Sequence, residues 1–548
     1  MNFKKRIMLI GVDGASYKMI NPLIKSNHLP NLKRFKDDGS TGTLNSNLPI
    51  HSLNSWSSIL TGKNPGKHGV YDVFDRFDGH YRKRIIDKSN LKAKTIWQYL
   101  DLFNLKSVIV NLPVTYPPSP LNGVMISGML TTPNQMCTYP CHLNNELKAS
   151  GYKIDLFRVE GESPSSYYES AIDIMSTRHQ TFVDLLLNTD WDFSAIDYTS
   201  ISRFQQKFWN QDELIQGLYR KMDTLLGDLL DRFDDGRTTF LFFSDHGYKS
   251  IEKKFFVNEW LWEKGYLSRN INTKPATFPD FWDELFSSNQ DSKMIEQILA
   301  KLKITKDNIG KLLPDLFIET LKHVSPMKLR KAFPRENLIV DWKNTKAYFL
   351  SEQSQGININ LKDREPHGIV KPGFEYERLR DDIIRELYRL RDPHTFKNVI
   401  DVVFRREELY HGDALEFAPD IIFAPRNYEY LPKPSKRTSR LFIGSAKDLY
   451  PVYSAPCPDG IFMAFGPQIK RDGDLDRVSQ YDIAPTVLSL LGLPLPKDFD
   501  GEPMHHILKD NDYYADVQSS YNPQASLVNI DKDKMFERTN AVMSAFMQ

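Results

Sequence analysis

Cysteine is scarce in this sequence. The 548 residues contain three cysteines, Cys137, Cys141 and Cys457. An odd and small number of cysteines excludes a disulfide framework of the kind that stabilises secreted domains. We therefore expect the protein to work in a reducing compartment, the cytoplasm.

The sequence also lacks an excess of charge of either sign and lacks a long hydrophobic run. Lysine and arginine total 71 against 70 for aspartate and glutamate, so no net field attracts a nucleic acid polymer or an anionic membrane. The apolar run Ile7–Val12 is interrupted by Asp13, far short of a secretory or membrane-spanning segment. We expect no membrane span, a buried strand at Ile7–Val12, and a local site for any small anionic substrate.

Short apolar runs recur along the chain between amphipathic stretches. Their length and helical spacers predict an α/β fold with a mainly parallel central sheet covered by helices on both faces. Ligands of such sheets gather at the carboxyl ends of the strands. The predicted core strands are Ile7–Val12, Ser107–Val110, Phe193–Tyr198, Thr239–Phe243, Ile421–Ala424 and Ile461–Phe465.

The pattern changes twice along the chain. Between about Pro275 and Arg335, charged segments of helical period replace core strands, which predicts a helical insertion or cap over residues 271–339. The remaining residues 1–270 and 340–505 are predicted to form one discontinuous catalytic domain. Residues 506–548 contain an acidic stretch and a Ser/Asn-rich stretch, which predicts a loosely attached C-terminal tail.

Two short motifs follow predicted strands. Gly11-Val12-Asp13-Gly14 places a carboxylate between glycines that allow close backbone approach, although such an aspartate also commonly caps the next turn. Ser244-Asp245-His246-Gly247 places a carboxylate beside an imidazole, a donor set that suits zinc, manganese or iron. A structural histidine bonded to its neighbours is the alternative.

A third segment, Ser52 to Gly62, continues as Lys63 to Gly69. Its serines are typical of a helix start, and an apparent helix covers Ser55 to Leu60. Capping is therefore the simplest interpretation of these serines from the residues alone.

The order of these three segments resembles the type I phosphodiesterases of the alkaline phosphatase superfamily. The resemblance implies an alkaline-phosphatase-like fold over roughly Lys4 to Pro503, excluding the insertion. It implies that Ser52 is the nucleophile, at a helix N-terminus that favours an anion. It also implies that Asp13, Asp245 and His246, with Ser52, bind one divalent metal ion. His51, beside Ser52, is a candidate catalytic helper.

The second metal site of that family is degenerate in this sequence. The resemblance places Ser202, Gln206 and Pro456 where the family has an Asp and two His ligands, and none of these three is a good zinc ligand. Cys457 and Asp197 are the candidates to restore the site. A small buried thiol and a solvated or paired carboxylate are the simpler interpretations of these two residues.

Three hypotheses follow. The first is a metal-dependent hydrolase or transferase that acts on a small phosphorylated or sulfated substrate through Ser52 and one ion of zinc, manganese or magnesium. The second is a catalytically inactive pseudo-enzyme that keeps the fold and a ligand pocket. The third is an ordinary two-metal nucleotide pyrophosphatase that recruits Cys457 or Asp197.

Overall fold

A nine-stranded sheet forms the centre of the protein in the computed structural model. The structure describes residues 4–75, 81, 84–131, 136–156, 162–269, 340–434, 441–444, 454–471 and 473–509. The predicted insertion at 271–339 therefore lies outside the described residues, as does the predicted tail from 510 onward. In order across the sheet, the strands are β20 (Gly473–Ser479), β2 (Ser40–Asn45), β19 (Asp459–Phe465), β9 (Thr238–Phe243), β1 (Arg6–Val12), β8 (Phe193–Tyr198), β5 (Ser107–Leu112), β6 (Gly123–Ser127) and β7 (Thr138–Tyr139).

The central sheet is mixed but mainly parallel, as the sequence predicts. Of its eight neighbouring strand pairs, five are parallel, and the antiparallel pairs are β2 with β19, β19 with β9, and β6 with β7. Every residue of β5, β8 and β9 is buried, which explains why these strands show no regular alternation of apolar and polar residues.

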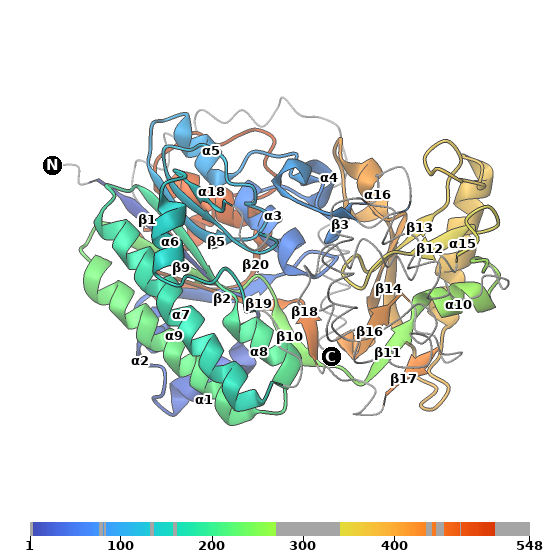
Figure 1. Ribbon diagram of the computed structural model, residues 1–548, viewed down its shortest axis with the longest axis horizontal. Helices are drawn as coiled ribbons and strands as arrows, with labels where there is room; N and C mark the ends of the chain where they lie inside the picture. The colour runs from blue at the N-terminus through green and yellow to red at the C-terminus, as the bar shows by residue number, and fades with distance from the viewer. Residues whose placement is uncertain are drawn as a thin grey trace, which may run out of the picture.

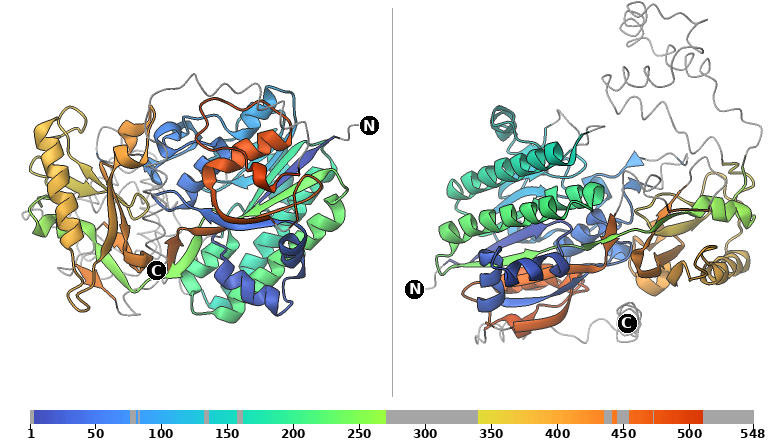
Figure 2. Two further views of the ribbon diagram at one scale, coloured as in Figure 1. Left: turned by 180° about the vertical axis from the view of Figure 1, so that it is seen from behind. Right: turned by 90° about the horizontal axis from the view of Figure 1, so that it is seen from below.

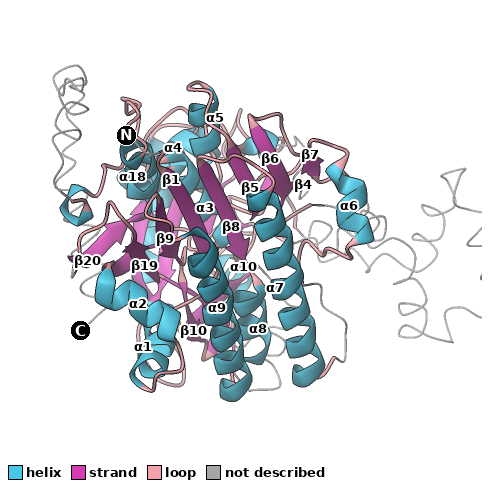
Figure 3. Ribbon diagram, turned by 90° about the vertical axis from the view of Figure 1, so that its left-hand side faces the viewer, coloured by secondary structure: helices cyan, strands magenta, loops and turns pink. Residues whose placement is uncertain are grey.

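Helices cover both faces of this sheet (Figures 1 and 3). Met8, Ile10 and Val12 of β1 pack into one core with one set of helices, whereas Ile7 and Leu9 pack into a second core with the other set. This alternation follows from the period of two along a strand. The first set is α1 (Tyr17–Lys25), α2 (Pro30–Asp38), α6 (Leu143–Ala149), α7 (Pro164–Leu187), α8 (Ser200–Phe208) and α9 (Asp212–Phe233), and the second is α3 (Ser52–Thr61), α5 (Ile96–Asp101) and α18 (Ile483–Leu490).

An accessory part lies beside the central one (Figures 1 and 2). It holds a four-stranded sheet, a three-stranded sheet and their own hydrophobic core. Its strands are β12 (Ala347–Phe349), β13 (Gly356–Ile359), β15 (Ile421–Pro425) and β14 (Ile400–Arg405) in one sheet and β16 (Tyr430–Lys433), β11 (Lys253–Phe256) and β17 (Phe442–Ile443) in the other; its helices are α10 (Val257–Glu263), α15 (Phe374–Arg389) and α16 (Arg406–Leu409).

The prediction for Ile421–Ala424 needs a correction. This segment is a buried strand, as expected, but β15 pairs antiparallel with β13 and β14 in the accessory sheet and not with the central strands. An apolar run indicates burial on both faces but carries no information about which sheet the strand joins. Residues 340–434, which the sequence groups with the central domain, accordingly build most of the accessory part.

A short antiparallel ladder lies where the chain passes between the two parts. Strand β10 (Gly247–Ser250) pairs with β18 (Ser454–Cys457), with Gly247 opposite Cys457 and Ser250 opposite Ser454. The remaining short elements are α4 (Pro65–His68), β3 (Phe74–Asp75), β4 (Arg84–Ile85) and the 3-10 helices η1 (Lys88–Asn90), η2 (Leu415–Phe417), η3 (Arg426–Tyr428), η4 (Gln480–Asp482) and η5 (His505–Ile507).

The predicted start of the C-terminal tail and the expected lack of a membrane span can both be compared with the described residues. The predicted tail begins at residue 506, but Ile507 and Leu508 are buried in a central core and Leu508 bridges to Ile469, so the packed fold reaches at least this point. None of the described helices combines the length and the hydrophobicity that crossing a lipid bilayer requires.

Candidate active site

The neighbouring parallel strands β1 and β9 bring Asp13 and Asp245 together. In the pairing of β1 with β9, Gly11 lies opposite Phe243, and each strand continues for two residues to an aspartate. Because the register is parallel, Asp13 and Asp245 emerge at the same edge of the sheet. Both side chains are buried, at 1% exposure. The site therefore lies at the carboxyl ends of the strands, where ligands of such sheets bind.

Helix α3 brings Ser52 to the same edge. Ser52 is the first residue of this helix, and Trp56 one turn later lies against Gly11 of β1. A Cβ atom at position 11 would lie 2.3 Å from Cζ2 of Trp56, so only glycine allows this approach. The sequence prediction that the glycines around Asp13 permit close contact is confirmed at Gly11.

The four side chains form one compact cluster. The Ser52 hydroxyl lies 3.1 Å from Oδ2 of Asp13 and 3.2 Å from Nε2 of His246. Nε2 of His246 lies 3.3 Å from Oδ1 of Asp13 and 3.6 Å from Oδ2 of Asp245. One ligand atom each from Asp13, Asp245 and His246 lies within 4.8 Å of the others, and no other group of three such residues occurs in the described part of the chain.

The buried carboxylates of the cluster favour a bound cation. Oδ1 of Asp13 and both carboxylate oxygens of Asp245 are buried without a hydrogen-bond partner. Burial, together with the nearby Asp13 and Asp197, raises the pKa of Asp245 well above its usual value. Since an unpaired buried carboxylate is costly, these oxygens fit a bound positive ion.

The His246 ring is oriented as a metal-binding histidine would be. Its Nδ1 lies 3.1 Å from the Gly247 carbonyl, a bond that requires the proton on Nδ1 and leaves the lone pair of Nε2 directed at the carboxylates. Burial lowers the pKa of His246, although the charge of Asp13 acts to raise it. The lowered pKa favours the neutral ring. The donor set of two carboxylates, one imidazole and one hydroxyl suits a divalent ion.

His51 has a different environment from the one expected of a catalytic helper. It is the N-cap residue of α3, and its Nδ1 accepts a hydrogen bond from the Asn54 backbone at 3.4 Å. Its Nε2 lies 3.2 Å from the Tyr71 carbonyl. With both ring nitrogens turned to backbone groups, the geometry favours a positioning role for His51 over the predicted catalytic one.

The degenerate positions lie beside the cluster, and Tyr248 fills the space next to them. The Ser202 hydroxyl is 3.0 Å from the hydroxyl of Tyr248, whose ring packs edge-on against His246 with centroids 5.4 Å apart. Pro456 lies opposite Tyr248 in the β10–β18 ladder. Among the described residues, this side of the cluster offers hydroxyl, amide and proline groups in place of charged ligands.

Neither predicted substitute ligand joins a second cluster in the described part of the chain. Cys457 packs with the apolar group of Ile50, Ala424 and Tyr428, and burial raises the pKa of its thiol to about 12. Asp197 is fully buried on β8 with both carboxylate oxygens lacking a hydrogen bond. Burial and then Asp13 raise the pKa of Asp197. What separates Asp197 from Asp245 is that it belongs to no group of three potential ligand side chains among the described residues.

The charged residues that follow Ser52 in sequence have structural partners. Lys63 pairs with Asp498, whereas Lys67 and His411 both contact Asp500. Arg203 on α8 forms an ion pair with Asp155 at 2.7 Å.

Sequence reasoning missed several residues that support the site. Ser46 and Gln480 both donate to the backbone carbonyl of Asp245, at 2.6 and 2.5 Å. No motif marks them, because they come from distant segments. Tyr248 was open to prediction, since it lies two residues after His246 in an extended segment and therefore on the same side.

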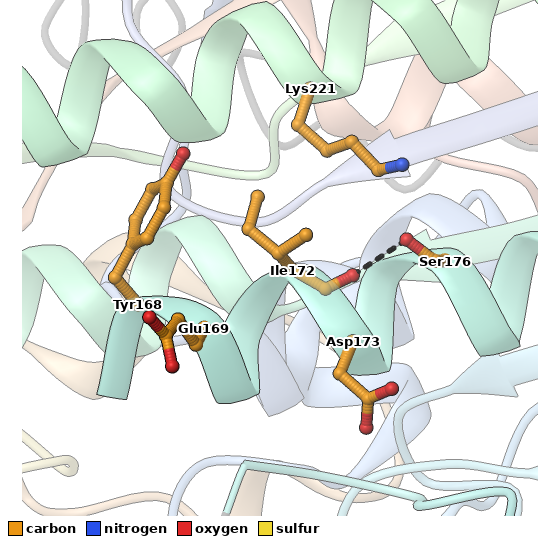
Figure 4. A pocket seen from close by; sticks show the side chains of 6 residues that line it. All are labelled: Tyr168, Glu169, Ile172, Asp173, Ser176 and Lys221. Atoms are coloured by element: carbon orange, nitrogen blue, oxygen red, sulfur yellow. Dashed lines mark hydrogen bonds between the residues drawn. The ribbon is translucent and has the colours of Figure 1, made fainter. Parts of the chain in front are cut away.

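Two hollows are described on the surface of the protein. One lies between α7 and α9, is lined by Tyr168, Ile172, Asp173 and Lys221 among others, and contains none of the cluster residues (Figure 4). A narrower cleft includes Gln206 and Pro456, two of the degenerate positions, and Ile50, two residues before Ser52. It too is lined by none of the four cluster residues.

Similarity to solved structures agrees with this architecture. Phosphonoacetate hydrolase from Sinorhizobium meliloti 1021, in complex with phosphonoacetate, has a TM-score of 0.53 and 14% identity, covering 89% of this chain and 96% of that one. The alkaline phosphatase PafA has a TM-score of 0.51 and 13% identity, covering 93% of this chain and 100% of that one. Murine ectonucleotide pyrophosphatase/phosphodiesterase 5, an inactive form in complex with AMP, has a TM-score of 0.48 and 12% identity, covering 92% and 100%.

The likenesses to phosphonoacetate hydrolase and PafA show an alkaline-phosphatase-like α/β fold. No curated protein matches the sequence. The sequence profile of type I phosphodiesterase / nucleotide pyrophosphatase, however, matches residues 7–438. That range contains Asp13, Ser52, Asp245 and His246. The chain therefore belongs to the type I phosphodiesterase/nucleotide pyrophosphatase family, a family of phosphoester hydrolases.

Proposed function

We propose that the protein is a hydrolase or transferase of small phosphoesters that uses Ser52 as its nucleophile and one divalent ion. Asp13, Asp245 and His246, with the Ser52 oxygen, would hold this ion. The observation that carries the proposal is the buried cluster itself, in which Ser52 lies 3.1 Å from Asp13 and 3.2 Å from His246 beside unpartnered carboxylate oxygens. Zinc, manganese and magnesium are the candidate ions, and sulfate esters are the alternative substrate class.

In this proposal, Ser52 would attack a phosphate bound at the N-terminus of α3. The first turn of α3 leaves backbone N–H groups without intrahelical partners, and these favour an anion. When bound, the ion would lower the pKa of the Ser52 hydroxyl and neutralise charge on the phosphate. The hydroxyl loses its proton as Oγ forms a bond to phosphorus, while the bond from phosphorus to the leaving alcohol breaks and that alcohol takes up a proton. Water then hydrolyses the phosphoseryl ester, or a second alcohol displaces it in a transferase.

The degenerate second site supports the choice of one ion. Ser202, Gln206 and Pro456 supply no carboxylate or imidazole, and Ser202 is bonded to Tyr248. The same observation favours a second candidate function, a pseudo-enzyme that binds a ligand without turnover. We also propose a cytoplasmic location on the basis of the three free cysteines.

The decisive experiment compares variants within the cluster. Purified wild-type protein should contain about one ion per chain, and an Asp245→Ala/His246→Ala double variant should lose both the ion and turnover of an aryl phosphodiester. Ser52→Ala should stay folded and lose turnover. Ser55→Ala is the matched control, because the Ser55 hydroxyl lies buried in the same helix without a hydrogen bond, and its removal should leave turnover intact.

Other outcomes of this experiment would support the alternative functions. About two ions per chain would support the two-metal phosphodiesterase. A folded protein with one bound ion and no turnover of phosphate or sulfate esters would support the pseudo-enzyme. Equal turnover in Ser52→Ala and Ser55→Ala would exclude Ser52 as nucleophile.

A further inference from the structure

Two buried hydroxyl groups border the cluster on the side of the degenerate positions. Ser202 lies in the first turn of α8, and Tyr248 lies in β10, two residues after His246. Their oxygens are 3.0 Å apart, and the two residues are 1% and 7% exposed. Helix α8 and strand β10 lie side by side (Figure 1). Neither hydroxyl is among the groups that would hold the proposed ion.

The backbone after Asp13 fixes this pair. A Cβ atom at Gly14 would lie 2.6 Å from Cδ2 of Tyr248 and 3.1 Å from Cβ of Ser202. Because residue 14 has no side chain, both residues can lie against it. Gln205, three residues after Ser202 on the same face of α8, donates to the Gly14 carbonyl at 2.8 Å. The pair is therefore held next to Asp13.

The Tyr248 ring connects the pair to the nucleophile. It packs edge-on against His246, with ring centroids 5.4 Å apart, and Nε2 of His246 lies 3.2 Å from the Ser52 hydroxyl. The pair thus borders the cluster from the side of His246 as well as from the side of Asp13. A phosphate bound at Ser52 would have these hydroxyls as neighbours.

The pair holds one proton more than it can use internally. Each hydroxyl offers one proton, and across 3.0 Å one hydroxyl donates to the other. Among the described residues, neither oxygen has another hydrogen-bond partner, so the second proton has no acceptor. A buried donor without an acceptor is costly. This proton therefore fits an oxygen atom of a bound ligand.

A phosphoryl group supplies such oxygens. Its charged non-bridging oxygens are strong acceptors of hydrogen bonds. A hydroxyl that accepts a hydrogen bond becomes a better donor, and a phenol keeps its proton at neutral pH. The chain of donors would then run from Ser202 to Tyr248 and from Tyr248 to the phosphoryl oxygen. Ser202 is also a position at which the family resemblance places a ligand of the second metal.

We propose that Tyr248, oriented by Ser202, donates a hydrogen bond to a non-bridging oxygen of the phosphoryl group bound at Ser52, in place of a second ion. The proposal rests on the proposed function of Ser52, whose phosphate site it extends. A donor fixed in a buried site lowers the barrier where negative charge is greater in the transition state than in the substrate. Tyr248 is then a catalytic residue and Ser202 a positioning residue.

The test compares Tyr248→Phe with Tyr376→Phe in full-length protein with excess Mn²⁺. Tyr248→Phe keeps the ring and removes the hydroxyl, so kcat/KM for an aryl phosphodiester should fall about 100-fold. Ser202→Ala should lower it about tenfold, because the Tyr248 proton stays but its orientation is lost. Tyr376 is also 7% exposed, and its hydroxyl donates to Asp420 in the accessory part, so Tyr376→Phe should keep wild-type turnover.

Two further measurements separate a donor from a merely structural side chain. The ion content of Tyr248→Phe should stay at the wild-type value, since the ring still packs against His246. Calorimetry with inorganic phosphate should give a Kd roughly tenfold higher for Tyr248→Phe than for wild type, and an unchanged Kd for Tyr376→Phe. This binding readout applies even if no ester is turned over.

Equal kcat/KM and equal phosphate Kd in wild type and Tyr248→Phe would overturn the proposal and leave Ser52 as the nucleophile. Loss of the ion in Tyr248→Phe would also overturn it, because Tyr248 would then act by holding His246. Full turnover in Ser52→Ala would refute the proposed function, whereas a phosphate Kd that depends on the Tyr248 hydroxyl would still support the hydrogen bond. If Tyr248→Phe does not fold, unchanged kcat/KM and Kd in Ser202→Ala would exclude the pair.

Discussion

His51 holds the first turn of α3 in place, and with it the Ser52 hydroxyl. The imidazole accepts from the Asn54 backbone on one side and faces the Tyr71 carbonyl on the other. Burial lowers the pKa of His51 to about 4, against an opposing effect of the Tyr71 carbonyl, so the ring is neutral at ordinary pH. A neutral ring with both nitrogens engaged is suited to fixing a helix start rather than to moving a proton.

Replacing His51 separates these two roles. His51→Ala removes the cap and should lower the free energy of unfolding by about 1 kcal/mol, with a lower kcat because Ser52 is less well placed. His51→Asn keeps a capping oxygen and should recover most of both losses. Urea unfolding and steady-state kinetics measure them. An asparagine variant as stable as wild type but as inactive as Ser52→Ala would instead support the catalytic role predicted from the sequence.

A second buried histidine makes stability depend on pH. His68 is 0% exposed, its Nδ1 accepts from the Val70 backbone, and its Nε2 lies 2.9 Å from the Ser58 hydroxyl. Burial lowers the pKa of His68 from 6.5 to about 3. The unfolded chain therefore binds a proton below pH 6.5 that the folded chain does not, and stability present above pH 6.5 is lost as the pH falls toward 3.

The slope of this loss is measurable. One proton contributes about 1.4 kcal/mol per pH unit to the free energy of unfolding between the two pKa values. Denaturation series between pH 7 and pH 4 should show that His68→Gln has a shallower slope than wild type. Parallel curves for the two proteins would mean that His68 is protonated in the fold.

The junction of β1 and α3 positions the cluster at the scale of elements. Trp56 is fully buried between Gly11 and Phe243, with the Trp56 and Phe243 ring centroids 5.0 Å apart. The helix can approach the strand only because residue 11 has no side chain. The distance from Ser52 to Asp13 thus depends on a glycine two residues before Asp13.

Gly11→Ala should move α3 away from the sheet. Overpacking at this site should lower the free energy of unfolding by about 1–3 kcal/mol and reduce turnover. A smaller ring should restore space, so Gly11→Ala/Trp56→Phe should recover part of the lost activity relative to Gly11→Ala. Additive losses in the double variant would show that the two positions do not interact.

The same junction shows what sequence can predict. The position of Asp13, Asp245 and His246 at one edge was predictable because each follows a buried run, and parallel strands end at one edge. Their grouping with Ser52 as a metal site came from the family resemblance and not from these runs. The accessory sheet could not be predicted, because the run Ile421–Ala424 indicates a buried strand without indicating its partners β13 and β14. The supports of Asp245 were also not predictable, since Ser46 and Gln480 reach its backbone carbonyl only through long-range packing and carry no motif.

At the scale of the whole molecule, Asp500 joins segments that are far apart in sequence. Its carboxylate contacts Lys67 at 2.6 Å, His411 at 2.9 Å and the Asn64 backbone at 2.7 Å. Burial acts to raise the pKa of Asp500, but the His411 and Lys67 hydrogen bonds outweigh burial and lower it well below its usual value. This contribution to stability is present above pH 3.8 and is lost as the pH falls below it.

Removing the Asp500 charge should loosen this connection. Asp500→Asn should lower the free energy of unfolding by about 1.5–3 kcal/mol, because charge-assisted hydrogen bonds to a buried group are lost. Asp498→Asn is the control, since Asp498 is 62% exposed and its pair with Lys63 should contribute at most about 1 kcal/mol. Guanidinium denaturation compares the two, and equal effects would refute a special role for Asp500.

The ladder between β10 and β18 has a consequence for how such proteins diversify. The chain leaves the central part after Ser250 and returns at Ser454, and these two residues are paired neighbours. The two described sheets of the accessory part are therefore carried on a single excursion of the chain. Such an excursion can be enlarged, shortened or exchanged during evolution without changing the strand order of the central sheet, so the buried cluster can be inherited unchanged while the accessory part beside it is replaced.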